Sequence, residues 1–103
     1  MLFLVLVMQK ETVPLPPEKA LELAIASIEQ IKKDPRPKAA YSFAGLPGGI
    51  AIVDVKSHVE LDAIITSLPL SLTSNFQIYP LMTLDEALKN LKEGLKMLKE
   101  SMK

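Results

Sequence analysis

The chain has 103 residues, the length of one small domain, and 49% of them are hydrophobic against 23% charged. Twelve basic residues balance twelve acidic ones, so the chain lacks the basic excess with which nucleic-acid-binding proteins neutralise phosphates. The sequence has no cysteine and a single histidine, His58, which excludes disulfides, thiolate metal sites, a cysteine nucleophile and a multi-histidine metal site within one chain. We therefore expect no nucleic-acid partner, no metal and no cofactor.

The first segment, Leu2–Met8, is continuously apolar. Its length fits a strand, and its lack of alternation indicates that both faces are covered. A membrane-spanning helix needs ~20 apolar residues, and a signal peptide needs a basic start and a small-residue cleavage site. The segment has none of these. We expect a buried strand in a cytoplasmic protein with no membrane partner.

A helix and a hairpin are predicted next. Glu18–Lys33 carries apolar residues at spacings of three and four, and Asp34-Pro35-Arg36-Pro37 ends it because a residue before proline is disfavoured in a helix. Ala39–Ala44 and Ile50–Val55 are predicted strands joined by Gly45-Leu46-Pro47-Gly48-Gly49. This glycine-rich segment lacks the lysine, the hydroxyl and the following helix of a phosphate loop, so we interpret it as a turn.

Two capping boxes predict the remaining helices. Ser57-His58-Val59-Glu60 opens a short helix that Pro69 ends, and Thr83-Leu84-Asp85-Glu86 opens the last one. Asn75–Leu81 is a predicted strand between them. In the last helix the apolar residues alternate by four and three, the spacing of a coiled-coil seam; they are Leu84, Leu88, Leu91, Leu95, Leu98 and Met102.

The order strand, helix, strand, strand, helix, strand predicts an α+β ferredoxin-like βαββαβ domain over residues 1–82, and residues 83–103 add a C-terminal amphipathic helix. In this topology the first and third strands are central. Pro80 fits the fourth strand at an edge, because proline cannot donate to a strand ladder.

Two crossover helices cover only one face of such a sheet, yet Leu2–Met8 is apolar on both faces. A second copy packed sheet to sheet would bury the other face, giving a homodimer or higher homo-oligomer. The alternative is that the last helix folds back over its own sheet or covers a neighbour's. Of these covers we favour the second copy.

Several short motifs, in order, carry a family resemblance: Met1-Leu2-Phe3, Ala44-Gly45, Asp54-Val55-Lys56-Ser57 and Leu68-Pro69-Leu70. Together they resemble muconolactone isomerases over about residues 1–81. The resemblance implies a dimeric α+β barrel, assembly into larger rings, and cofactor-free proton transfer that moves a double bond in a lactone. No catalytic residue is carried over, because the first helix and second strand differ from the family pattern.

Four residues are candidates for ligand binding. Ser42, Gln77 and Tyr79 are polar residues on otherwise apolar strands. If Phe76 and Ile78 pack under the helices, Gln77 and Tyr79 point to the opposite, barrel-side face of the sheet. A few polar groups in an apolar cavity are typical of a small-ligand site, although hydrogen bonding across a subunit interface would explain them equally well. Asp54 could act as a base if buried, but a turn or capping role is favoured. His58 starts a capped helix, where we expect it to be exposed and without a functional role.

Two functions follow as hypotheses. The first is a homo-oligomeric, muconolactone-isomerase-like protein that binds a small apolar or lactone-type ligand, with isomerase activity left open. The second is a non-catalytic module whose last helix docks on its own copies or on a partner.

Overall fold

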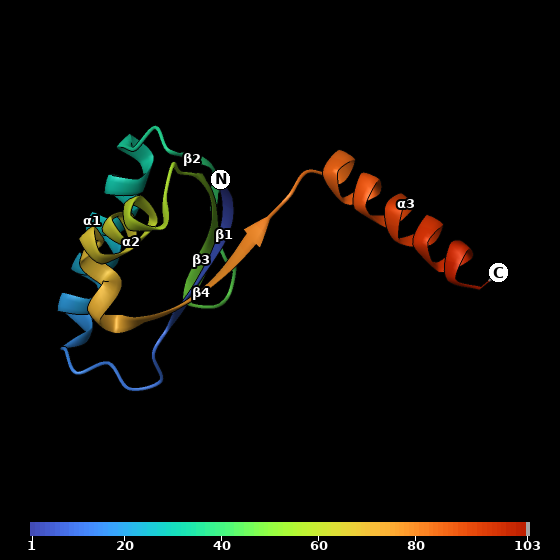
Figure 1. Cartoon of the computed structure of the whole chain (residues 1–103). Coiled ribbons are helices and arrows are strands. Elements are labelled where there is room, and N and C mark those ends of the chain that lie inside the picture. Colours follow the sequence, from blue (N-terminus) through green and yellow to red (C-terminus); the bar gives the residue numbers. More distant parts are fainter. Residues whose placement is uncertain (103) are drawn as a thin grey trace.

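A computed structural model describes residues 1–102 and confirms the predicted α+β class (Figure 1). In chain order the elements are β1 (Leu2–Gln9), α1 (Pro17–Lys33), β2 (Pro37–Ser42), β3 (Gly48–Asp54), α2 (His58–Ser67), the 3₁₀ helix η1 (Pro69–Thr73), β4 (Ser74–Leu81) and α3 (Leu84–Ser101). Lys103, the last residue of the predicted C-terminal unit, lies outside the described residues.

The four strands form one antiparallel sheet in the order β2-β3-β1-β4. The first and third strands are central, as predicted. Phe3 of β1 lies opposite Val53 of β3 on one side and Pro80 of β4 on the other, so these three side chains share one face. Pro80 sits on an edge strand, where its missing N–H costs no ladder bond on the outer side.

Two details differ from the sequence prediction. β2 begins and ends two residues early, at Pro37 and Ser42, and its register shifts between Pro37 and Ala39. The turn that follows keeps Gly45 and Gly48 at positive φ (86° and 141°), and a side chain at Gly48 would collide with the carbonyl oxygen of Val7. The 3₁₀ helix η1 was not predicted, because its single proline-led turn has no apolar period.

The core lies between α2 and the sheet. It consists of closely packed apolar residues that are at most 8% exposed: Phe3, Val5, Val53, Val55, Leu61 and Ile64. The Ser57 hydroxyl accepts a hydrogen bond from the Glu60 N–H at 3.2 Å and so starts α2 where the sequence predicts.

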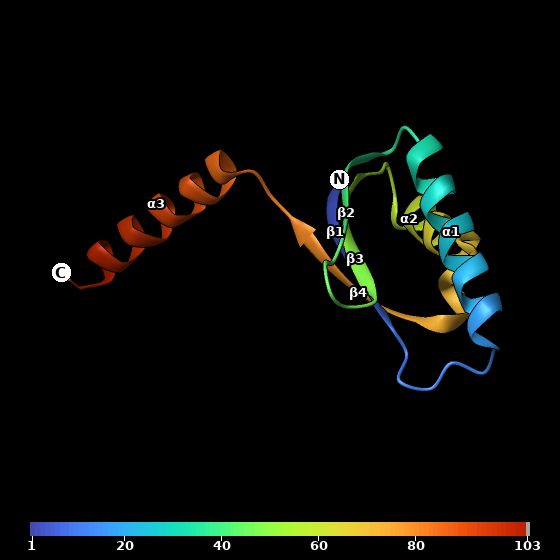
Figure 2. The ribbon, with the colours of Figure 1, turned by 180° about the vertical axis from the view of Figure 1, so that it is seen from behind.

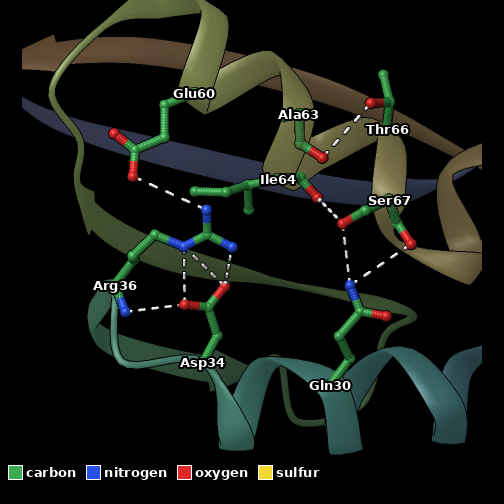
Figure 3. Close-up of polar contacts among 8 residues, drawn as sticks. All are labelled: Gln30, Asp34, Arg36, Glu60, Ala63, Ile64, Thr66 and Ser67. Atoms are coloured by element: carbon green, nitrogen blue, oxygen red, sulfur yellow. Dashed lines mark hydrogen bonds and ion pairs between the residues drawn. The ribbon is translucent and has the colours of Figure 1, made fainter.

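Polar contacts attach α1 to its neighbours (Figure 3). Ser27 is fully buried, and its hydroxyl accepts from the Leu70 N–H at 2.9 Å. The Gln30 amide donates to the Ser67 hydroxyl at 3.0 Å. These bonds hold one side of α1 against the α2–η1 segment.

The end of α1 joins α2 through charge. The Arg36 guanidinium donates to both carboxylate oxygens of Asp34, at 2.9 and 2.8 Å, and lies 3.8 Å from Glu60 on α2. The hydrogen bonds from Arg36 lower the pKa of Asp34. In turn, the Asp34 carboxylate raises the pKa of Arg36.

Both helices α1 and α2 lie on one face of the sheet, and α3 extends away from the domain, as Figures 1 and 2 show. The outer face of the sheet, which the two helices leave uncovered, carries alternate residues of β1, β3 and β4: Leu2, Leu4, Leu6, Ile50, Ile52, Gln77, Tyr79 and Leu81. No residue of α3 is buried, and the molecule measures 65 × 28 × 24 Å. Within residues 1–102 no helix has both the length and the apolar character needed to cross a membrane.

Candidate ligand-binding site

A cavity of about 900 Å³ lies between α1 and the helix-covered face of the sheet. One wall is the apolar side of α1, including Leu21, Ala24 and Ile28. The opposite wall comes from β2, β3 and the end of β1, and η1 closes one side through Leu70 and Thr73. Leu21 is 65% exposed, so the predicted apolar side of α1 is only partly covered.

The cavity exists because the strand residues below α1 are small. Ala40 and Ser42 on β2, and Gly49 and Ala51 on β3, line it. Along β3 the side chains on this face shrink from Val53 in the core to Ala51 and then Gly49. Helix and sheet cannot close this space with side chains of that size, since a packed interior needs interdigitating atoms from both layers.

The lining is mainly apolar, with a few polar groups. The polar members are Gln9, Lys32, Tyr41, Ser42, Thr73 and Ser74. Small-molecule sites combine an apolar surface with a few such groups, and volumes of 300–1,000 Å³ are usual, so both size and composition fit a small ligand. None of the lining residues is a carboxylate or a histidine. Tyr41 pairs with Ile50, so its side chain lies on the outer face of the sheet, and Lys32 is the lining side chain able to exchange a proton.

The four predicted ligand-binding residues do not come together. Ser42 lines the cavity. Gln77 and Tyr79 lie on the outer face of the sheet, where the Tyr79 hydroxyl donates to the Gln77 side-chain oxygen at 2.8 Å. Asp54 is also on that face, and its carboxylate accepts from the amino group of Met1 at 3.2 Å. A ligand that touched Ser42 inside the cavity would be separated from the other three by the sheet.

His58 is exposed at the start of α2, as predicted, and its ring packs edge-on against Phe3 with centroids 5.7 Å apart. It does not line the cavity. Among residues 1–102, no group of three histidine, cysteine or carboxylate side chains is arranged to hold a metal ion.

Most of the cavity residues were not predicted as ligand-binding residues. Ala24 and Ile28 belong to the predicted helix Glu18–Lys33, and Ala40 and Ala51 belong to the two predicted strands of the hairpin. A signal was present: the apolar stripe of a long helix faces a strand pair built from alanine, serine and glycine. This pattern predicts a cavity only if α1 is known to lie over β2 and β3, and that arrangement is seen only in the tertiary structure.

Comparison with solved structures places this geometry among known folds. A crystal structure of muconolactone isomerase matches 81% of this chain and 90% of that protein, with a TM-score of 0.68 and 26% sequence identity. The 5-chloro-2-hydroxyhydroquinone dehydrochlorinase of Burkholderia phenoliruptrix AC1100, in complex with 2,5-dihydroxybenzoquinone, matches 80% of this chain and 94% of that protein, with a TM-score of 0.57 and 14% identity. No family model matches the sequence, and a comparison with curated proteins finds no relative.

The chain is therefore a ferredoxin-like α+β protein with one helix-covered sheet face. Within that class its fold is muconolactone-isomerase-like, as the resemblance of the short motifs predicts.

Proposed function

We propose that this protein binds a small, mostly apolar, ring-shaped ligand in the cavity between α1 and the sheet. The observation that carries the proposal is the cavity itself: about 900 Å³, lined by alanine, leucine and isoleucine with Ser42, Thr73 and Lys32 among its polar groups. A cavity of this size leaves helix surface without packing partners, and an apolar ligand would supply them.

The structural neighbours support a ligand of this class. One is named for its action on muconolactone, and the other is in complex with 2,5-dihydroxybenzoquinone, so both involve small oxygenated rings. The isomerase-like reaction of the first hypothesis would need a proton acceptor beside the ligand. Lys32 is the group of the lining that supplies proton exchange, and it is not a member of the predicted set of four.

A thermal-shift titration tests the binding proposal. Muconolactone, 2,5-dihydroxybenzoquinone and benzoate are added separately to the full chain, and at least one is expected to raise the melting temperature, because a ligand that binds the folded state stabilises it. Ala24→Phe places a ring in the cavity and should weaken binding by about tenfold or more, a loss of about 1.4 kcal/mol.

Ala26→Phe is the matched control, since Ala26 is exposed on the same helix and does not line the cavity. It should bind like the unchanged protein. A screen in which none of the three compounds shifts the melting temperature, or in which both variants bind equally well, would refute a site in this cavity. Muconolactone that binds but keeps its ultraviolet absorbance over hours would argue for binding without isomerisation.

The second candidate function is assembly, and the observation that favours it is the outer face of the sheet. Leu2, Leu4 and Leu6 lie there with no helix of their own chain above them. A second copy packed on this face would form the dimeric α+β barrel of the sequence prediction. Leu4→Lys should then lower the molecular mass in light scattering, and an unchanged mass would contradict sheet-to-sheet pairing. Placement of the protein in the cytoplasm stays a prediction.

A further inference from the structure

Helix α3 presents a continuous apolar stripe that is exposed along its whole length. Six residues form this stripe, from here called the leucine seam, and each is at least 50% exposed: Leu84, Leu88, Leu91, Leu95, Leu98 and Met102. The start of the helix is stabilised locally, because Thr83 and Glu86 form a complete capping box. A continuous exposed apolar surface of this kind is typical of a site that binds another protein segment.

The width of the leucine seam indicates which occupant fits. Alternation by four and three over the whole helix gives the narrow stripe of a coiled coil, whereas a helix lying on a sheet or a globular core shows a broader apolar face. One flank of the seam is Asp85, Lys92 and Lys99, which would meet apolar side chains if the helix lay flat on the outer face of the sheet. A second helix suits the seam better than a sheet does.

The other flank allows close approach. It consists of Ala87, Gly94 and Ser101, three small residues spaced seven apart along the same side of the helix. Nothing within its own chain requires glycine at position 94. Its φ is not in the left-handed region, and no atom lies within 4 Å of the position that a Cβ would occupy. Glycine also destabilises a helix interior relative to alanine. Small side chains at this flank let the backbones of two packed helices come together more closely than leucine or lysine would.

The leucine seam is complementary to itself when two copies run in opposite directions. In an antiparallel pair of identical helices, one helix runs up while the other runs down. The residue numbers of two core residues that face each other therefore always add up to the same sum. A sum of 186 pairs Leu84 with Met102, Leu88 with Leu98, and Leu91 with Leu95 of the second copy, which uses every seam residue.

The two flanks agree with this register. It places Gly94 beside Gly94 of the second copy at the two-fold axis, with Ala87 facing Ser101. On the other flank it places Asp85 of each copy beside Lys99 of the other, which gives two contacts of opposite charge. Lys92 lies beside Lys92 of the second copy, which is one contact of like charge. It also sets the two helix dipoles in opposition. In a parallel pair the charged flank would face the small-residue flank, and the Asp85–Lys99 contacts would be lost.

We propose that α3 is an interaction surface for a second copy of this chain, and that the two α3 helices pair antiparallel through the leucine seam with Gly94 at the centre. The pair is independent of the cavity, because no residue of α3 lines it. It also leaves the outer face of the sheet free. A chain with a pairing helix and a pairing sheet would have two separate two-fold interfaces, and so could build assemblies larger than a dimer.

Cysteine cross-linking tests the direction of the pair, and the natural chain has no cysteine to interfere. Full-length Gly94→Cys is expected to form a disulfide-linked dimer under mild oxidation, because residue 94 meets itself at the antiparallel axis and a disulfide needs Cα atoms about 4.4–6.8 Å apart. Leu91→Cys should stay unlinked, whereas in a parallel pair it would face its own copy. Glu93→Cys, on the far side of the helix, is the control for random collision.

Linked dimer from Gly94→Cys alone supports the proposal. Linked dimer from Leu91→Cys but not from Gly94→Cys overturns the antiparallel direction, and equal linking of all three variants, or of none, overturns the pairing.

Molecular mass tests the pairing without a cross-link. Leu95→Lys places a charge in the middle of the leucine seam and should lower the mass measured by light scattering at the same concentration, whereas Glu93→Lys should leave it unchanged. Gly94→Leu should also lower the mass, although leucine favours the helix over glycine, because it blocks the close approach. The melting temperature of the βαββαβ domain should hold in all three, since α3 contributes nothing to its core. A Leu95→Lys protein with the mass of the natural chain would refute the proposal.

Discussion

The two halves of the helix-covered sheet face differ in how they are filled. Beneath α2, Phe3 and Val53 of the sheet and Val55, which follows β3, meet Leu61 and Ile64 in a closed core. Beneath α1, β2 and β3 carry alanine, serine and glycine, and a cavity of about 900 Å³ remains. The backbone arrangement of the two halves is alike, with one helix over antiparallel strands. The two halves therefore differ in the volume of their side chains. Large side chains fill the half beneath α2 and stabilise the fold, whereas small side chains leave space beneath α1 in which a ligand could bind.

Phe3→Ala breaks the filled half and carries the largest expected effect. Phe3 is 6% exposed and packs against His58. Loss of its ring should lower the free energy of unfolding by about 3–5 kcal/mol, the usual cost for a buried phenylalanine. Urea denaturation measures it. As the comparison, Leu21→Ala in the wall of the hollow half should cost under about 1 kcal/mol, because Leu21 is already 65% exposed. Equal costs would mean that the two halves are packed alike.

Val53 and Ala51 allow the comparison to be made within one strand. Val53→Ala removes two carbons from the core and should destabilise the protein by about 2 kcal/mol. Ala51→Val adds two carbons at the cavity wall and should be neutral or stabilise the protein by up to about 1.5 kcal/mol, while weakening any ligand bound there. Urea denaturation of the two variants measures the change in the free energy of unfolding for each. Destabilisation by Ala51→Val would show that the cavity has no room.

Ser27→Ala sharpens the comparison at the attachment of α1. The Ser27 hydroxyl is the acceptor for the Leu70 N–H, and its loss leaves that donor without a partner near the buried side of the helix. The expected cost is about 1–2 kcal/mol. Because α1 is the roof of the cavity, ligand affinity should fall along with stability. Ser71→Ala is a suitable control, since its hydroxyl takes part in no hydrogen bond among the described residues.

Asp34→Asn should give the smallest effect, and one that depends on pH. The folded pKa of Asp34 is lowered by the Arg36 hydrogen bonds, so the pair stabilises the fold above the ordinary aspartate pKa of about 3.9 and the stabilisation is lost as pH falls through the lowered value. The melting temperature should drop by a few degrees at pH 7, and the variant and the natural chain should converge at pH 2. A difference that persisted at pH 2 would assign the effect to packing.

Much of the fold follows from local sequence. Apolar runs, prolines and two capping boxes predict the order of the strands and helices, and the central position of Leu2–Met8 and Ile50–Val55 is confirmed. These features act within one turn of helix or across one hairpin, so neighbouring residues determine them. The candidate site was less predictable. Of the four predicted ligand-binding residues, Ser42 lines the cavity, whereas Gln77, Tyr79 and Asp54 lie on the opposite face of the sheet.

The sequence by itself determined the α+β order, the muconolactone-isomerase-like fold and the seam spacing of the last helix. Only the tertiary structure decided that α1 stands over small residues and leaves a cavity, and that α3 projects from the domain with its leucines uncovered. The physical reason is range. Helix caps and strand periodicity depend on residues a few positions apart, while a cavity depends on the volumes of side chains from four elements that meet only after the chain has folded.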